Sequence, residues 1–368
     1  MSSLALLLLV LACGGQGAEP TTTPVLSPTP TPTAVAAPTV VPTMPPTQAA
    51  IGYIDTHNHL LRGPRRQCDF DETTEVALAA MESFGIQKTL IMPTPSFRTK
   101  CDPKALAEVV NKHPERFAFL AGGGTLNPMI QQAVRSGQVT PDTWSRFEEI
   151  ATEIVRDGAV GFGEMTAEHF SFYDWHPYET APPDHPLFLL LADIAARHDV
   201  PIDLHMEVIP QDVPFSEISP YSRAHRSPNN PSMLHENLTA FERLLDHNPE
   251  ARIVWAHAGW DNTGFRTVAL MRRLLQDHPN LYIQIRPLPP GLPLPNRPTT
   301  ANGQIAPEWE DLIRSFPDRF VIGLDSFYEP VRPQLFQSSI GFLSQLPPDL
   351  ARKVAYENAV RIYKLNRN

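Results

Sequence analysis

The sequence is poor in cysteine, with three residues, and it has fewer basic than acidic residues. Lys and Arg number 30 and Asp and Glu number 40, which gives a formal charge of −10 without a long run of either sign. Such a chain does not attract polyphosphate, so we expect no nucleic-acid partner. Hydrophobic residues make up 42% of the 368 positions, which is ordinary for a soluble globular protein of one large or two small domains.

The chain begins with an apolar run, residues 4–11, that is too short to span a bilayer. A small residue, Ala12, and then Cys13 follow this run. The pattern resembles a bacterial lipoprotein signal, in which cleavage before Cys13 leaves that cysteine as the lipidated N-terminus. The three residues before the run include no Lys or Arg, and an ordinary secretory signal is the alternative. We therefore expect an exported protein that meets a bacterial cell-envelope membrane only through its lipid anchor, or else is secreted.

Two residue types dominate residues 20–48, where 18 of the 29 positions are Thr or Pro. This composition favours extended, polyproline-like conformations and cannot bury enough surface to fold. We predict three segments in the chain. They are a signal peptide at 1–12, a disordered tether at 13–50 that begins with lipidated Cys13, and a folded domain at 51–368.

After residue 50, short apolar runs rich in Val, Ile and Phe alternate with longer segments of helical periodicity. The predicted strands are Tyr53–Thr56, Gln87–Met92, Phe117–Ala121, Ala159–Gly163, Pro201–Leu204, Arg252–Ala256, Leu281–Ile285 and Phe320–Leu324. The predicted helices include Thr73–Phe84, Trp144–Arg156, Leu187–His198, Leu234–His247, Phe265–Asp277 and Pro307–Phe316. Eight strand–helix repeats in about 320 residues predict an α/β fold of the (β/α)8 TIM-barrel type.

The longest connections run from a predicted strand to the helix that follows it. They are residues 166–186, 208–233 and 287–306. In a barrel of this type such loops gather at the C-terminal face, where active sites are built.

Metal-binding residue types stand at the ends of five predicted strands. The first strand is followed by His57-Asn58-His59, and because strand side chains alternate, both imidazoles should point into the barrel mouth. Alone this pair is weak evidence, since roughly 0.4 such spacings arise by chance from 13 histidines. The other strand ends carry Glu164, His205, His257 and Asp325. Metal-binding residue types at five strand ends, all on one face of a barrel, indicate a metal site.

The order of these residues resembles the amidohydrolase superfamily. His-x-His, Glu, His, His and Asp follow the first, fourth, fifth, sixth and eighth predicted strands. The phrases Ile-Asp-Thr-His-Asn-His, Trp-Ala-His-Ala-Gly and Gly-Leu-Asp-Ser, with the terminal Glu-Asn-Ala-Val-Arg-Ile-Tyr, are similar to its amidohydrolase-related branch. That branch includes enzymes of the aminocarboxymuconate-semialdehyde decarboxylase type. The resemblance covers residues 51–368 and says little about the substrate.

The resemblance implies that His57, His59, His205 and Asp325 bind a divalent metal ion. Imidazole and carboxylate ligands favour Zn2+, with Mn2+ or Fe2+ as alternatives.

Glu164 decides how many ions are bound. If its carboxylate points into the mouth, it could bridge two ions, as in related families with a carboxylate on the fourth strand. The two ligand sets would then be His57, His59 and Asp325 on one ion and His205 and His257 on the other. If Glu164 instead lies behind the ligands, one ion is bound and His257 polarises a substrate carbonyl or carries a proton.

The resemblance implies hydrolysis of an amide, lactone or other ester bond of a small molecule. A bound metal lowers the pKa of water to near neutrality and so supplies a hydroxide nucleophile. Asp325 could accept the proton of that water and return it to the leaving group, or act only as a ligand. One alternative is nonoxidative decarboxylation of a conjugated or aromatic acid. Another is a non-catalytic tethered binding protein, which the full set of six candidate ligands disfavours.

Several loop residues are candidates for substrate binding. Arg286 follows the seventh predicted strand and could hold a substrate carboxylate, or form a structural ion pair. Trp260 follows the sixth strand. Tyr173 belongs to an aromatic and histidine-rich loop after the fourth strand, which either forms a substrate wall or packs on itself. The other members of that loop are His169, Trp175, His176 and His185.

Asp203 and Glu207 flank His205 at the period of a strand and therefore face the same way. We expect one of them, with Glu207 favoured, to orient the His205 imidazole. Cys68 and Cys101 lie in the loops after the first and second strands, which adjacent strands bring together. In an exported protein these cysteines can form a disulfide, the alternative being two unrelated thiols.

Overall fold

The computed structural model describes residues 52–62, 67–68, 70–95, 103–328 and 331–365. All of them belong to one unit of the chain, residues 41–368. The signal, the tether with Cys13, and Cys101 lie outside the described residues, so lipidation and the disulfide stay predictions. Within the described part, no helix has the length and apolar character needed to cross a bilayer.

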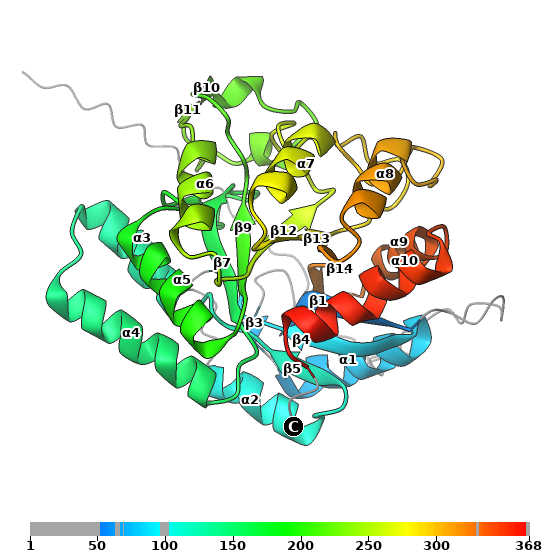
Figure 1. The fold of residues 1–368 in the computed structure, drawn as a ribbon, viewed down its shortest axis with the longest axis horizontal. Helices are drawn as coiled ribbons and strands as arrows, with labels where there is room; N and C mark the ends of the chain where they lie inside the picture. Colours follow the sequence, from blue (N-terminus) through cyan, green and yellow to red (C-terminus); the bar gives the residue numbers. More distant parts are fainter. Residues whose placement is uncertain (1–51, 63–66, 69, 96–102, 329–330, 366–368) are drawn as a thin grey trace, which may run out of the picture. The chain divides into compact units, whose positions relative to one another are not determined.

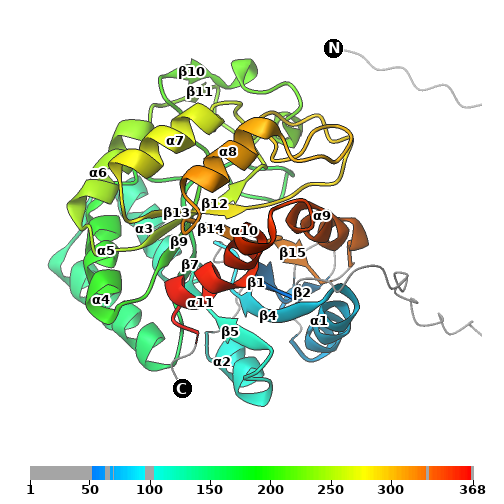
Figure 2. The same ribbon diagram turned by 45° about the vertical axis from the view of Figure 1, so that its right-hand side comes forward.

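Eight parallel strands follow one another around the centre of this unit (Figures 1 and 2). They are β1 (Tyr53–His59), β4 (Ile86–Ile91), β5 (Phe117–Phe119) continued by β6 (Ala121–Gly122), β7 (Phe162–His169), β9 (Ile202–Met206), β12 (Ile253–Ala258), β13 (Leu281–Ile285) and β14 (Phe320–Ile322) continued by β15 (Ser326–Phe327). The hydrogen-bonded orders are β15-β1-β4-β5 and β14-β13-β12-β9-β7-β6. Because β5 runs into β6 and β14 into β15, the two sheets form one ring, and the predicted (β/α)8 barrel is confirmed.

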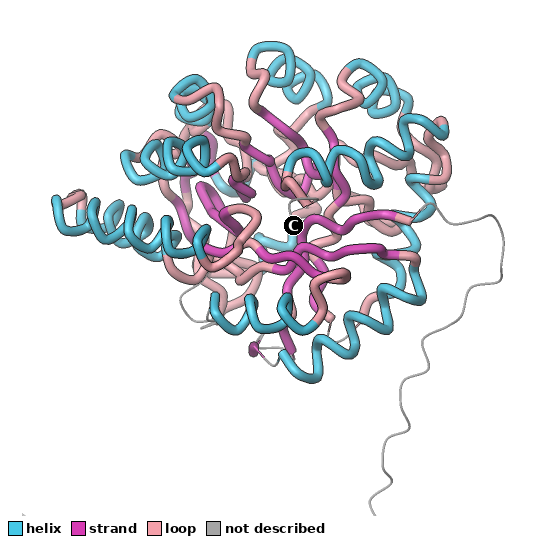
Figure 3. The backbone as a smooth tube through the Cα atoms, turned by 60° about the horizontal axis from the view of Figure 1, so that its bottom comes forward, coloured by secondary structure: helices cyan, strands magenta, loops and turns pink. Residues whose placement is uncertain are grey.

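The helices lie outside this ring, as Figure 3 shows. They are α1 (Phe70–Phe84), α2 (Pro103–Lys112), α3 (Leu126–Ser136), α4 (Pro141–Arg156), α5 (Pro186–His198), α6 (Leu238–His247), α7 (Val268–Asp277), α8 (Pro307–Ser315), α9 (Pro333–Leu343), α10 (Pro348–Arg352) and α11 (Asn358–Ile362), with a π-helical turn at Lys353–Glu357. Two short 3-10 turns lie at Phe215–Glu217 and Arg223–Arg226.

Local chemistry sets several boundaries that differ from the sequence prediction. Helix α4 begins earlier, at Pro141, because Thr140 Oγ1 accepts from the Thr143 amide and proline suits the first helical position. Helix α7 begins later, since Thr267 accepts from the Leu270 amide. Helix α6 also begins later, because the predicted first turn instead forms β11 (Met233–Leu234), paired with β10 (Val213–Pro214).

The long connections carry further short antiparallel pairs. β8 (Glu179–Thr180) pairs with the end of β7, which therefore extends through His169 rather than ending at the predicted Gly163. β2 (Leu61–Arg62) pairs with β3 (Gln67–Cys68). These pairs lie at the C-terminal ends of barrel strands, the face where the loops were expected to gather.

The barrel interior is apolar in its N-terminal half. One buried cluster lies there. It contains Ile54, Leu90, Leu120, Val254 and Val321 from the strands, with Ile362 and Tyr363 from the C-terminal segment. A larger buried cluster fills the space between the strands and the helices. Since the inner apolar residues precede the predicted ligands on their strands, the polar side chains are confined to the C-terminal end of the barrel.

Candidate metal centre

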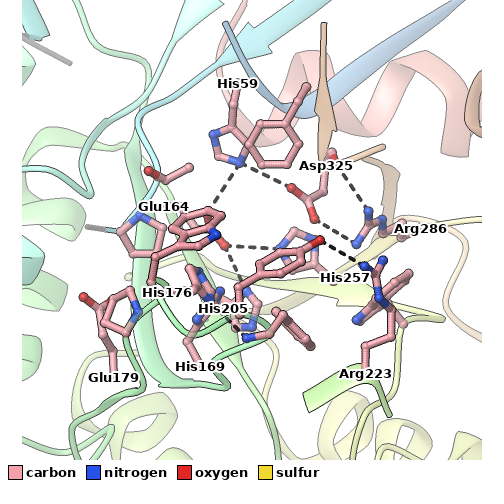
Figure 4. Close-up of a pocket in the computed structure, with 18 of the residues that line it drawn as sticks. His59, Glu164, His169, His176, Glu179, His205, Arg223, His257, Arg286 and Asp325 are labelled. Atoms are coloured by element: carbon pink, nitrogen blue, oxygen red, sulfur yellow. Dashed lines mark hydrogen bonds and ion pairs between the residues drawn. The ribbon is translucent and has the colours of Figure 1, made fainter. Parts of the chain in front are cut away.

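The six predicted ligands meet around the carboxylate of Glu164, and Figure 4 labels five of them. Glu164 Oε2 lies 3.7 Å from His57 Nε2 and 3.6 Å from His59 Nε2. Glu164 Oε1 lies 2.8 Å from His205 Nδ1 and 3.3 Å from His257 Nε2. The sixth side chain, Asp325, places Oδ1 3.3 Å from His59 Nε2. Each oxygen of one carboxylate therefore faces its own pair of imidazoles.

The donor atoms fit divalent metal ions. Two ligands of a tetrahedral Zn2+ stand roughly 3.3 Å apart, given zinc–nitrogen distances of about 2.0–2.1 Å, and the spacings above bracket this value. The buried Nε2 atoms of His57 and His59 have no hydrogen-bond partner among the described residues. Leaving such an atom unpaired costs about 1–3 kcal/mol, a cost that a bound cation removes.

Three overlapping ligand groups lie within 4.8 Å. They are His57, His59 and Glu164; Glu164, His205 and His257; and His57, His257 and Asp325. Glu164 links the first two groups, so the arrangement accommodates two ions with a shared carboxylate as well as one ion.

Burial and mutual charge fix the protonation of the cluster. Burial would raise the pKa of Glu164, but hydrogen bonds to His205, His257 and His57 hold that pKa well below its usual range. Burial together with the positive charge of His57 lowers the pKa of His257 to about 3. At neutral pH the Glu164 carboxylate is therefore ionised, and the His257 imidazole is neutral and able to offer a lone pair.

Two imidazoles are oriented through their Nδ1 atoms. His59 Nδ1 donates to the Met92 carbonyl at 2.9 Å, and His57 Nδ1 lies 3.1 Å from Asp203 Oδ1. Burial opposes protonation of His57, but the charge of Asp203, with a contribution from Glu164, raises its pKa well above the ordinary value. These contacts leave both Nε2 atoms facing Glu164, the arrangement typical of metal-binding histidines.

Glu207 was expected to orient His205. Its Oε1 lies 3.9 Å from His205 Nε2, beyond hydrogen-bonding distance, and instead accepts from Asn262 Nδ2 at 2.6 Å. The carboxylate that contacts a candidate ligand ring from behind is Asp203, on His57. Sequence reasoning placed Asp203 on the correct face but with the wrong histidine, because the stagger between strands decides which neighbour an inward side chain meets.

Two candidate ligands have left-handed backbones: φ is 63° at His257 and 47° at Asp325. Such conformations cost of the order of 1–3 kcal/mol for a residue with a Cβ and gather at functional sites. Side chains of β1 hold the segment around Asp325. Asp55 Oδ1 accepts from the Leu324 amide at 3.0 Å, and Asn58 Oδ1 accepts from the Ser326 amide at 3.1 Å. Sequence reasoning missed both, although they lie within the His-x-His phrase.

A cavity of about 440 Å³ opens onto the cluster, a size suited to a small molecule. Its base is formed by His59, Glu164, His205, His257 and Asp325. Its walls include the aromatic residues Phe172, Tyr173, Trp175, Trp260 and Phe327, the arginines Arg223, Arg286 and Arg332, and the polar residues His169, His176 and Glu179. The predicted substrate-binding residues Tyr173, Trp260 and Arg286 thus all line it.

Comparison with known proteins agrees with this geometry. The sequence matches a family profile described as Amidohydrolase over residues 54–365. The chain belongs to the amidohydrolase family. The resemblance drawn from the strand-end motifs is confirmed at this level, and family membership supports an enzyme. No curated protein matches the sequence.

Several solved structures are similar to this amidohydrolase, and the first of the following has the same fold. IDCase from Metarhizium anisopliae, in its apo form, is 11% identical, with 86% of this chain and 97% of that chain covered and a TM-score of 0.51. 5-Carboxyvanillate decarboxylase from Sphingomonas paucimobilis is 17% identical, with coverages of 85% and 99% and a TM-score of 0.45. A mutant PTE-like lactonase from Deinococcus radiodurans is 16% identical, with coverages of 86% and 98% and a TM-score of 0.49.

In this amidohydrolase Arg286 forms an ion pair inside the cavity. Its Nη1 lies 2.8 Å from Asp325 Oδ2, and its guanidinium lies over the Trp260 ring at 4.6 Å. Burial would raise the pKa of Asp325, but the charge of Arg286 holds it well below its usual range. The foreseen ion pair of Arg286 is therefore present, and its role in substrate binding stays a prediction.

The loop after β7 both packs on itself and lines the cavity. The rings of Tyr173 and Trp175 stack at 5.3 Å, and Arg223 donates to the Tyr173 hydroxyl at 2.9 Å. His185, which was grouped with this loop, instead caps α5 by accepting from the Leu187 amide.

Glu179 is a cavity residue that sequence reasoning missed. It lies opposite His169 in the β7–β8 pairing. Burial and the charge of Glu164 raise its pKa to about 8. A two-residue strand inside a loop has no periodicity to detect, so no sequence signal marked this position.

Proposed function

We propose that the protein is a metal-dependent hydrolase that cleaves an amide, lactone or other ester bond of a small molecule. The observation that carries the proposal is the placement of Glu164, whose two carboxylate oxygens face two separate pairs of imidazoles at the base of the cavity. We propose that two divalent ions bind there, Zn2+ in the first place and Mn2+ or Fe2+ as alternatives. When bound, such ions polarise a substrate carbonyl and make water acidic.

The proposed ligand assignment follows the two faces of Glu164. One ion would be held by His57, His59 and Asp325 and the other by His205 and His257, with Glu164 available to both. This assignment uses every histidine of the cluster through a nitrogen that faces a carboxylate oxygen.

Asp325 is the proposed acid–base residue. It lines the cavity, and Arg286 occupies only its Oδ2, so Oδ1 remains on the side of the cluster. The ionised carboxylate accepts a proton from the attacking water and passes it to the leaving group as the scissile bond breaks. Because Arg286 makes Asp325 a weak base, the proton is readily released.

The test combines metal analysis with a substrate panel. The purified full-length chain should contain close to two divalent ions per molecule by mass spectrometry. It should hydrolyse at least one of p-nitrophenyl acetate, a γ-lactone and a p-nitroanilide, with activity lost to chelation and restored by Zn2+. Protein without stoichiometric metal, or activity that chelators leave unchanged, contradicts the proposal.

A second candidate is nonoxidative decarboxylation of a conjugated or aromatic acid. Three arginines and five aromatic rings line the cavity, an environment that suits a planar anion. In that reaction the bond to the carboxyl carbon breaks, CO2 departs, and the electron pair left on the ring carbon takes a proton that Asp325 accepts from water and passes on, which leaves hydroxide. Release of CO2 from 5-carboxyvanillate or 2,6-dihydroxybenzoate, without hydrolysis of the ester panel, would favour this reaction.

We also propose that the protein is exported and held by lipid on Cys13, with the Thr- and Pro-rich segment as a tether. Labelled fatty acid should enter the wild-type protein but not Cys13→Ala.

Thiol counting before and after reduction tests the proposed disulfide between Cys68 and Cys101.

A further inference from the structure

His257 is held in a backbone conformation that its residue type does not favour. Its φ is 63°, in the left-handed region. This conformation costs a residue that has a Cβ about 1–2 kcal/mol. The orientation of the peptide between Ala256 and His257 sets this angle. Groups that grip that peptide therefore determine where the His257 imidazole, 3.3 Å from Glu164, can point.

Two buried side chains grip the peptide from its two sides. Gln284 Oε1 accepts from the His257 amide at 2.9 Å, and Arg266 Nη1 donates to the Ala256 carbonyl. Gln284 is fully buried and Arg266 is 3% exposed. Neither is among the residues that line the cavity, so neither is placed to touch a substrate.

Gln284 replaces main-chain pairing that is interrupted at this point. The register between β12 and β13 shifts between Trp255 and Ala258, which leaves the His257 amide outside the regular ladder. A buried amide without a partner is costly, and the Gln284 carbonyl supplies the acceptor.

Two features show that the Gln284 side chain is closely confined. Its Nε2 is buried without a hydrogen-bond partner among the described residues, which costs about 1–3 kcal/mol. A Cβ on Gly323 would stand 2.3 Å from the Gln284 amide, although Gly323 is not in the left-handed region. A side chain at 323 would therefore displace the Gln284 side chain from its present position.

Arg266 links the two strand ends that carry the second pair of imidazoles. It also donates through Nη2 to the carbonyl of Met206, which follows His205, and it lies over the Trp255 ring at 4.4 Å. The ladder between β9 and β12 reaches only Leu204 and Trp255. Arg266 therefore joins the strands just beyond the last ladder pair.

We propose that Gln284 and Arg266 are positioning residues that fix the Ala256–His257 peptide and so aim the His257 imidazole at Glu164. Gly323 leaves the space that Gln284 needs. The effect on metal binding rests on the proposed function, whereas the effect on the backbone of His257 does not.

The test titrates variants of the full-length protein with Co2+ and measures binding by the visible absorption of the bound ion. Gln284→Leu removes the acceptor, and Gly323→Ala displaces the Gln284 side chain without altering it. Both variants should lower the affinity for one of the two Co2+ ions by about 10–100-fold. This is the usual effect of removing a residue that orients a metal ligand. Gln284→Glu keeps an acceptor oxygen and should restore affinity to within a few fold.

Asn280→Leu is the matched control, because Asn280 is also buried and donates to main-chain carbonyls, those of Leu245 and Ala251, ahead of the starts of β12 and β13. Equal loss of Co2+ affinity in this control, or wild-type affinity in Gln284→Leu and Gly323→Ala, overturns the proposal.

A crystal structure of metal-free Gln284→Leu separates this proposal from the proposed function. The proposal expects His257 to leave the left-handed region and its imidazole to move away from Glu164. An unchanged His257 overturns the positioning role, even if the protein binds metal. Wild-type protein that binds no Co2+ counts against the proposed function alone, and the His257 backbone then decides this inference.

Discussion

The two faces of Glu164 are built differently. On one face, His57 and His59 are 0% and 1% exposed and are braced from behind by Asp203 and the Met92 carbonyl. On the other, His205 is 8% exposed, directs Nδ1 at Glu164 itself, and packs its ring 4.4 Å from His169. The contrast predicts that the proposed ion on the first face, or first half of the centre, would be held more rigidly than the proposed ion on the second.

Glu164 is the element shared by both halves, so its replacement should have the largest effect. Glu164→Gln should lose both ions and slow hydrolysis by roughly 1,000-fold, since a catalytic metal supplies several kcal/mol of transition-state stabilisation. Metal content and turnover of p-nitrophenyl acetate measure this. Glu168→Gln, on the same strand but bonded to Tyr178 and Thr180, is the control and should keep both ions.

Single-histidine variants separate the halves. His59→Asn should lower the metal content from two ions to one by losing the ion assigned to His57, His59 and Asp325. His205→Asn should also retain one ion, but should lose the ion assigned to His205 and His257. The two residual sites should differ in the visible spectrum of bound Co2+, because their remaining ligands differ. Complete loss of metal in either variant would mean that the two halves form one indivisible site.

Arg286 contacts the first half through Asp325, and its removal should move a pH profile. The positive charge of Arg286 lowers the pKa of Asp325, so Arg286→Met should raise that pKa and shift the acid limb of kcat/KM to higher pH. Arg223→Met, in the same cavity but bonded to Tyr173, should leave the limb in place. A shift of equal size in both variants would assign the effect to general charge instead.

Glu179 lies on the wall beside the second half, and its effect is the smallest. Its pKa is raised from 4.5 to about 8, so the folded protein holds a proton that the unfolded chain releases, and stability falls as pH rises through this window. Metal-free Glu179→Gln should therefore lose less Tm than the wild type between pH 5 and pH 8.5. Glu153→Gln, on α4 with a side chain that is 40% exposed, is the control and should follow the wild type.

The cluster could be predicted because barrel topology brings strand ends together regardless of the residues between them. His57 and Asp325 are far apart in the chain, yet both lie at the C-terminal end of a strand, and this placement predicted that they meet. The contacts behind the ligands could not be predicted in the same way. Asp203 meets His57 rather than His205 because of strand stagger, and Gln284 acts through a backbone amide, which leaves no trace in residue spacing.

The helices show the same division. Helix α5 was predicted nearly to the residue, because its apolar side chains recur at helical spacing over thirteen positions. The continuous helical segment formed by α10, the π-helical turn and α11 was not predicted, since the turn interrupts the 3.6-residue periodicity. Its position is set by packing, for example of Ile362 and Tyr363 against the barrel interior.

The ring of strands has a seam between its beginning and its end. There the regular pairing lapses at residues 323–325, and Asn58 holds Ser326, which is 268 residues away along the chain. An ion at the proposed site of His57, His59 and Asp325 would fasten the same seam. It would act as a reversible cross-link that closes nearly the whole folded chain into one loop, the geometry in which a clip restricts the unfolded chain most. The metal supply would then set the stability of the folded protein as well as its chemistry.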